Sequence, residues 1–240
     1  MLRWWDGAGW TMHTHDPATS TTSHHPPLAR WWGGLGVALQ VGLLLSIVTS
    51  LYVLYVDQEI LAFVEELRLR PDTVVESDGT RIDLLLIWSS VELVTWLGTA
   101  ILFVVWVYTL HHSARMDRSV LRHGSGWAIG AWFVPFLSLW RPFQMVLDVR
   151  RGAMGDDDLP TTFTLGWWWA TFLLAYATNL VAGLYYQSID TTPDDADLLL
   201  DSFASAASWE RWSAVLTIIC ALLAIRVVRE VRSLVRADPA

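Results

Sequence analysis

The sequence predicts an all-α integral membrane protein with four transmembrane helices and one Pro-broken segment that enters the bilayer without crossing it. Composition points to a membrane: 53% of the 240 residues are hydrophobic, 17% are charged and the mean hydropathy is +0.37. Four apolar runs are also long enough, at 1.5 Å per helical residue, to cross a hydrocarbon core of about 30 Å. Little of the chain is left for a catalytic domain outside the membrane.

Residues 1–12 predict a small Trp-rich hairpin, because the turn signal Asp6-Gly7 lies between aromatic residues. The string from Arg3 to Gly7 resembles the end of an actinobacterial module, domain of unknown function 2510, whose members commonly precede membrane domains. The usual upstream half is absent, so we expect either a remnant of the module or a start codon upstream of Met1. Residues 13–29, rich in Thr, Ser, His and Pro, are expected to form a disordered tether with solvated histidines.

The helical membrane domain is expected over residues 30–236. Its spans are expected at about 31–56, 84–110, 166–186 and 209–228. The first span carries small residues at every fourth position, a pattern that lets two helix backbones approach closely and predicts a helix-packing stripe. The stripe consists of Gly34, Ala38, Gly42, Ser46 and Ser50. The stretch after this span, Asp57–Arg70, is amphipathic and is expected to lie on the outer leaflet or to cap the bundle.

The segment 126–140 decides the predicted topology. It has 15 residues, about 22 Å as a helix, and Pro135 interrupts it. Cytoplasmic flanks are rich in arginine, and a segment that returns to the same side leaves 12 of the 16 arginines inside, against 10 if it crosses. We therefore favour four spans, a re-entrant or interfacial segment and two cytoplasmic termini. Five spans with the N-terminus outside are the alternative.

The same segment and the residues after it resemble the signature of an actinobacterial membrane family called domain of unknown function 4328, with similarity from Arg30 to Arg236. The residues that carry the resemblance are Gly126, Trp127, Gly130, Trp132, Pro135, Trp140, Arg141 and Pro142. The resemblance implies a multi-span protein of the bacterial plasma membrane. It implies no biochemical activity.

Glu92 is the acid placed most deeply in an apolar run, and it shares a helix face with Thr95 and Thr99. A carboxylate in lipid costs several kcal/mol, so we expect it to face the bundle interior. With Asn179, near the middle of the third span, these residues are a candidate intramembrane polar site, either a proton or ion relay or a set of packing contacts. Contacts with anionic lipid, worth about 1 kcal/mol each, are expected from Arg115, Arg118, Arg122, Arg150 and Arg151.

The sequence contains no recognised catalytic, phosphate-binding or zinc-binding motif, so we expect neither an enzyme nor a cofactor or metal site. Cys220 is expected to be a buried, unreactive thiol, and the net charge of −8 argues against binding nucleic acid. The favoured function is a non-enzymatic scaffold or accessory subunit that recruits partners at the plasma membrane, docks another membrane protein or a second copy, and rests on anionic headgroups on the cytoplasmic side. The alternative is a small transporter or channel-like protein with a midplane site at Glu92 and Pro135.

Overall fold

The computed structural model describes residues 2–5, 10–15, 30–70, 76–189 and 196–236. In these ranges the elements are β1 (Leu2–Trp5), β2 (Trp10–His15), α1 (Arg30–Leu69), α2 (Glu76–His112), α3 (Trp127–Gly130), the 3-10 helix η3 (Leu137–Leu139), α4 (Arg141–Met154), α5 (Phe163–Ile189) and α6 (Ala196–Arg236). After the first fifteen residues every described element is helical.

The predicted Trp-rich hairpin is formed by β1 and β2, which pair antiparallel with Leu2 opposite His15 and Trp5 opposite Trp10. An irregularity lies between Arg3 and Trp5, and β2 continues to His15, three residues past the predicted boundary. The turn signal Asp6-Gly7 and the tether over residues 16–29 lie outside the described residues.

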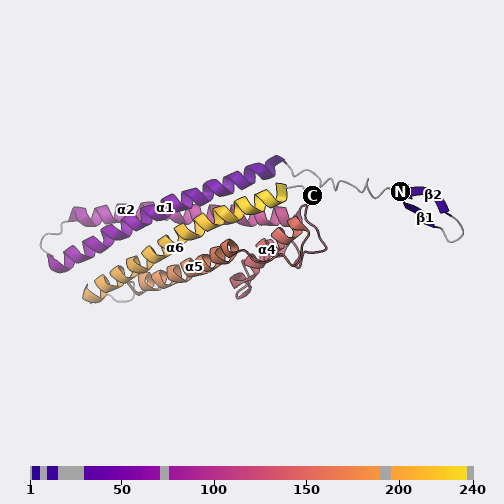
Figure 1. The fold of residues 1–240 in the computed structure, drawn as a ribbon. Coiled ribbons are helices and arrows are strands. Elements are labelled where there is room, and N and C mark those ends of the chain that lie inside the picture. Colours follow the sequence, from indigo (N-terminus) through magenta and orange to yellow (C-terminus); the bar gives the residue numbers. More distant parts are fainter. Residues whose placement is uncertain (1, 6–9, 16–29, 71–75, 190–195, 237–240) are drawn as a thin grey trace.

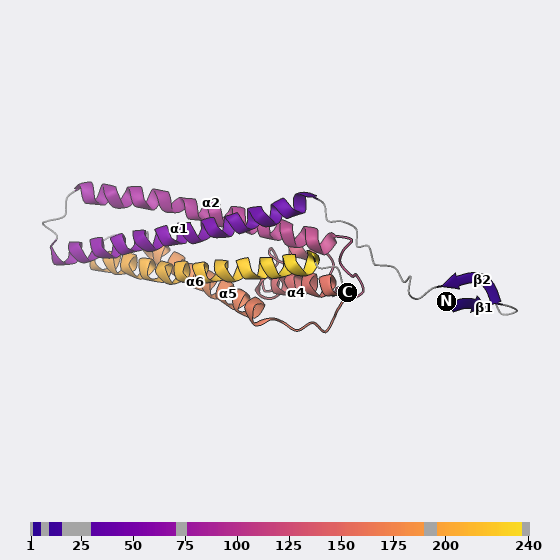
Figure 2. The same ribbon diagram turned by 45° about the horizontal axis from the view of Figure 1, so that its top comes forward.

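Four long helices form the body of the helical domain and run roughly alongside one another (Figures 1 and 2). α1 contacts both α2 and α6, and α5 contacts α6, so the order across the bundle is α2, α1, α6, α5. Chain neighbours are antiparallel, as short connections between long helices require. The two helices nearest the ends of the chain therefore lie at the centre of the bundle.

The two ends of the bundle carry charges of both signs, with an excess of arginines at one end and of acids at the other. At one end α4 packs beside α2 and α6, close to where α1 begins and α6 ends (Figures 1 and 2). We call this the arginine-rich end, because it carries Arg115, Arg118, Arg122, Arg141, Arg150, Arg151, Arg229, Arg232 and Arg236. The opposite end, where α1 ends and α6 begins, we call the acidic end, because it carries Glu59, Glu65, Glu66, Asp83, Asp197 and Asp201.

The main hydrophobic core lies toward the arginine-rich end. Leu39, Trp106 and Leu110 are fully buried there, and α4 adds Met145. A smaller core at the acidic end joins Val56, Ile60 and Val64 of α1 to Ala207 of α6. The amphipathic stretch 57–70 is thus the continuation of α1, with its apolar face against α6, and not a separate helix on the membrane surface.

Two helices, not the predicted four, are long and apolar enough to cross a membrane within the described part of the chain: Trp31–Leu69 and Asp83–His112. α5 contains no charged residue, but it is not among the two helices that reach the hydropathy of a membrane span, because it carries Trp, Tyr, Thr and Asn residues. α6 carries arginines and acids along its length. Length and composition alone therefore give weak support for a membrane protein, and they do not fix the topology.

The segment 126–140 is not a continuous helix. α3 lasts four residues, and Pro135 cannot donate a backbone hydrogen bond. The Leu137 amide then donates to the Pro135 carbonyl oxygen at 2.8 Å, which closes a γ-turn around Phe136 with φ of +64°. A γ-turn of this sign is rare and strained. The chain therefore reverses within a few residues, and η3 leads directly into α4.

Candidate functional site

Glu92 faces α1, as predicted for an acid that avoids lipid. Its carboxylate accepts a hydrogen bond from the Ser50 hydroxyl at 2.8 Å. Two turns further along α2, Thr99 lies 3.4 Å from the Ser46 hydroxyl, and a Cβ added at Gly42 would lie 2.8 Å from the Thr99 oxygen. The α1–α2 interface therefore combines close backbone approach with a row of polar contacts.

The helix-packing stripe divides into two parts. Gly42, Ser46 and Ser50 are buried against α2, whereas Gly34 and Ala38 are exposed. Nothing lies within 4 Å of a Cβ added at Gly34. Three of the five small residues thus pack within the chain, and only the exposed part is free to contact a partner.

The other two members of the predicted polar site do not join Glu92. The Thr95 hydroxyl donates to the Val91 carbonyl oxygen of its own helix, and Asn179 lies on the exposed surface of α5. Pro135 is also remote from Glu92: Trp132 of its segment contacts Phe103, eleven residues or about 16 Å along α2 from Glu92. The structure therefore builds no midplane site from Glu92 and Pro135.

Instead, Glu92 belongs to a group of acids on different helices that no sequence pattern predicted. Asp57 of α1 is 1% exposed and lies within electrostatic reach of Glu92 and of Glu210 on α6. The Tyr186 hydroxyl of α5 donates to Glu210 at 2.7 Å. We call Asp57, Glu92 and Glu210 the acidic cluster, to which all four long helices contribute once Ser50 and Tyr186 are included.

Asp57 is the member of the acidic cluster with the fewest polar contacts. Its Oδ2 atom is buried and has no hydrogen-bond partner among the described residues, whereas Glu92 and Glu210 each accept from a hydroxyl. Arg211, the guanidinium within electrostatic reach, is itself exposed. A buried carboxyl in this setting is costly as an anion and is stabilised by binding a proton.

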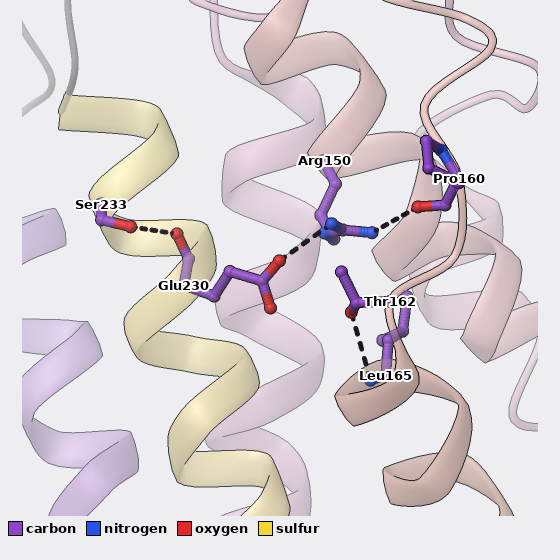
Figure 3. Close-up of polar contacts among 6 residues, drawn as sticks. All are labelled: Arg150, Pro160, Thr162, Leu165, Glu230 and Ser233. Carbon is purple, nitrogen blue, oxygen red and sulfur yellow. Dashed lines mark hydrogen bonds and ion pairs between the residues drawn. The ribbon is translucent and has the colours of Figure 1, made fainter.

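At the arginine-rich end the buried charges are paired. Arg150 of α4 is 4% exposed and donates to Glu230 of α6 at 2.8 Å and to the Pro160 carbonyl oxygen at 3.3 Å (Figure 3). In the same view the Leu165 amide donates to the Thr162 hydroxyl near the start of α5. The prediction that Arg150 contacts lipid headgroups is therefore wrong, because its side chain lies inside the protein.

The other four predicted lipid contacts lie nearer the surface. Arg118 and Arg122 are exposed and donate to the carbonyl oxygens of His112 and Asp157. Arg115 and Arg151 are half-buried. Their contact with anionic headgroups stays a prediction.

A second buried pair joins α4 to the loop after α2. The His123 Nδ1 atom lies 2.6 Å from the Asp148 carboxylate, and His111 Nε2 lies 3.9 Å from the same oxygen. Burial raises the pKa of the Asp148 carboxyl, and hydrogen bonds and charge from the two imidazoles lower it. The lowering is larger than the rise, so the pKa lies below the ordinary value of 3.8. His111 also lies 3.2 Å from the Ser125 hydroxyl through Nδ1. This network fixes the loop over α4.

The residues of the predicted signature hold the Pro-broken segment in place. The Arg141 guanidinium lies 5.5 Å from the Trp127 ring, and Pro142 begins α4. Trp132 contacts Phe103 of α2 and also Trp169 and Phe172 of α5. The Trp169 ring N–H closes the set by donating to the Leu139 carbonyl oxygen at 2.8 Å.

Comparison with protein families identifies the helical domain. The family described as Domain of unknown function (DUF4328) matches residues 76–233, about two thirds of the chain. The chain belongs to this family. A second family, Protein of unknown function (DUF2510), matches residues 1–24. No curated protein and no solved structure matches the chain.

The DUF4328 match begins at α2, so α1 lies outside it. It includes the Pro-broken segment, α4 and two members of the acidic cluster, Glu92 and Glu210. Asp57 lies on the helix before the match. In the part of the chain that the structure describes, no group of three His, Cys, Asp or Glu residues is arranged to hold a metal ion.

Proposed function

We propose that this DUF4328 protein is a four-span protein of the bacterial plasma membrane, with both termini cytoplasmic, that acts as a non-enzymatic scaffold or accessory subunit and recruits partners to the membrane. The observation that carries the proposal is a pair of unlike modules on one chain. A Trp-rich hairpin matches one family, and a helical domain with an apolar exterior matches another.

The outward faces of the long helices support four spans, although only two of the described helices are apolar enough along their length to be recognised as spans from composition. α5 exposes Leu174, Leu180 and Leu184, and α6 exposes Ile219 and Leu222. α1 and α2 carry similar exposed rows. Exposed apolar surface on every long helix is costly in water and favourable in lipid. The excess of arginines at one end of the bundle supports a cytoplasmic arginine-rich end.

The Pro-broken segment supports a re-entrant arrangement over a fifth crossing. Phe133 and Phe136 are 80% and 76% exposed and suit contact with lipid, while Trp132 inserts between α2 and α5. Backbone groups at membrane depth must be covered by protein or water, and the contacts with Phe103 and Trp169 supply such cover. A crossing would need about 20 helical residues, whereas α3 has four.

Removal of the hairpin tests the scaffold role. The full chain and a chain lacking residues 1–15 are each cross-linked in membranes, and the captured proteins are compared. We expect at least one partner to be captured only with the hairpin, and to be lost when Trp4 and Trp5 are both changed to Ala. Capture of the same partners by both chains would contradict recruitment through the hairpin.

Association through the membrane domain needs a variant outside the internal packing. G34L adds a side chain where space is open, whereas G42L would collide with Thr99 and disturb the fold itself. We expect G34L to reduce co-purification with a membrane partner or second copy while thermal stability is unchanged. Equal co-purification would confine recruitment to the hairpin.

The acidic cluster favours the second candidate, a small transporter, because intramembrane acids mark ion and proton pathways. Its site would be Asp57, Glu92 and Glu210, and not Glu92 with Pro135. Loss of a proton-coupled flux in vesicles carrying E92Q, with flux kept in the matched surface variant D83N, would support transport. Absence of any flux from the unmodified protein would exclude it.

A further inference from the structure

The three carboxyl groups of the acidic cluster, Asp57, Glu92 and Glu210, lie inside the bundle with few hydrogen-bond donors beside them. Ser50 donates to Glu92 and Tyr186 donates to Glu210, so these two acids each have a hydroxyl partner. Asp57 is the least exposed to solvent of the three, and its Oδ2 atom has no partner among the described residues. The polar contacts thus single out Asp57 as the group whose negative charge is least compensated.

The charges that face Asp57 make ionisation of all three acids unfavourable. Glu92 faces it from α2 and Glu210 faces it from α6, and both carry the same sign as Asp57. Arg211 of α6 is the positive group in reach, but it is exposed and water screens it. Tyr186 of α5 is within reach of both Asp57 and Glu210 and already donates to Glu210. Carboxyl groups that share a buried site hold a proton between them because like charges repel.

The chemistry of the site selects its ligand. A metal ion needs several ligands at fixed distances, and no suitable group of three occurs among the described residues. A proton needs one carboxyl oxygen and no coordination shell. We propose that the acidic cluster is a proton-binding site in which Asp57 carries the proton at neutral pH. This proposal does not depend on the scaffold role: the membrane domain would bind a proton whether or not the protein recruits partners.

Labelling with dicyclohexylcarbodiimide tests the site directly in the full chain in membrane vesicles. A protonated carboxyl adds across one C=N bond, its proton passes to nitrogen, and an acyl shift gives a stable N-acylurea that retains the whole reagent. An ionised carboxylate at the surface lacks the proton and reacts poorly. We expect peptide mass mapping at pH 7 to find the adduct on Asp57, with labelling that falls as the pH is raised.

Three variants make the labelling specific. D57N is expected to lose the adduct, and D83N, which changes an exposed acid of α2, is expected to keep it. E210Q removes a neighbouring negative charge, so Asp57 ionises more readily and its labelling at pH 7 should fall. Circular dichroism of each variant verifies that the helices form.

Infrared spectroscopy provides a readout that needs no reagent. The carbonyl band of a protonated carboxylic acid should be present at pH 7 in the unmodified protein and lost in D57N. Absence of both band and adduct in folded protein would overturn the proposal, as would equal labelling of Asp57 and Asp83. Protection of Asp57 by sodium chloride but not by choline chloride at constant pH would also overturn it, because the site would then bind a metal cation.

Discussion

The two ends of the bundle treat buried charge in opposite ways. At the arginine-rich end, Arg150 meets Glu230 and His123 meets Asp148, so each buried charged group lies against a partner that can carry the opposite charge. Toward the acidic end, Asp57 lies within electrostatic reach of two further carboxyl groups, Glu92 and Glu210, each of which accepts a hydrogen bond from a hydroxyl. Surface pairs occur at the acidic end as well, between Arg68 and Asp201 and between Arg81 and Glu59. The comparison therefore concerns buried groups: those at the arginine-rich end are paired, whereas Asp57 has no buried cation beside it among the described residues.

The largest expected effect comes from breaking the Arg150–Glu230 pair. R150M removes one partner of a buried pair, and because Glu230 is 30% exposed we expect a loss of about 2–3 kcal/mol in the free energy of unfolding. Denaturant unfolding in micelles, followed by tryptophan fluorescence, measures it. The double variant R150M/E230M should recover most of the loss.

The matched control is R236M, which changes an exposed arginine of the same end and should alter stability by less than about 0.5 kcal/mol. Equal effects of R150M and R236M would mean that the buried pair contributes nothing beyond surface charge.

Neutralising one aspartate at each end sharpens the comparison. D148N replaces a charge-assisted hydrogen bond to His123 and should cost about 1–3 kcal/mol. D57N removes a repelled or protonated carboxyl and should leave the unfolding free energy unchanged or slightly raised. Thermal and denaturant unfolding of the two isosteric variants can be compared directly. A loss in D57N as large as that in D148N would show that Asp57 is paired as an anion.

The pH dependence of stability in D148N separates the effect of the Asp148 charge from the effect of the side chain's shape, because asparagine keeps the shape and lacks the charge. The pKa of Asp148 is lowered in the folded protein, so its contribution is fully present above the ordinary value of 3.8 and is lost as the pH falls through the lower folded value. D148N lacks this contribution at every pH. Between pH 5 and pH 2 the unmodified protein should therefore lose more stability than D148N, and parallel curves would contradict the assignment.

The smallest expected effect lies in the Pro-broken segment. Phe136 has a φ of +64°, which glycine adopts without strain, so F136G should raise the unfolding free energy by up to about 1 kcal/mol. F133G is the control, since Phe133 is similarly exposed but has an ordinary backbone conformation. Destabilisation by F136G equal to that by F133G would indicate that the side chain matters more than the turn.

Short sequence patterns predicted those features of the fold that depend on neighbouring residues or on the cost of burying a charge. The turn signal between tryptophans predicted the hairpin, Pro135 predicted the break, and the cost of a charge in lipid predicted that Glu92 faces another helix. The start of α4 was also readable, since Pro142 suits a first helical turn and Met145 and Val149 share a face. That helix was nevertheless not among the predicted elements, and its residues entered the prediction only as signature residues, Arg141 and Pro142, and as lipid contacts, Arg150 and Arg151.

The contacts between distant helices could not be read in this way. Asp57 and Glu210 lie near the ends of apolar runs and resembled ordinary interfacial residues until packing of α1 against α6 brought them together. Arg150 looked like a lipid contact because its partner, Glu230, is 80 residues away. Asn179 satisfied the same sequence criterion as Glu92 but faces outward. Pairing across helices depends on rotation about each helix axis, which apolar spacing fixes only within a wide stripe.

Cysteine accessibility in intact cells tests the proposed arrangement most directly. In a C220A background, S119C reports the arginine-rich end and D83C reports the acidic end, and both positions are exposed. With four spans and a re-entrant segment, a membrane-impermeant maleimide should label D83C from outside and S119C only after permeabilisation. Labelling of S119C from outside, with D83C protected, would show that residues 126–140 cross the membrane as a fifth span.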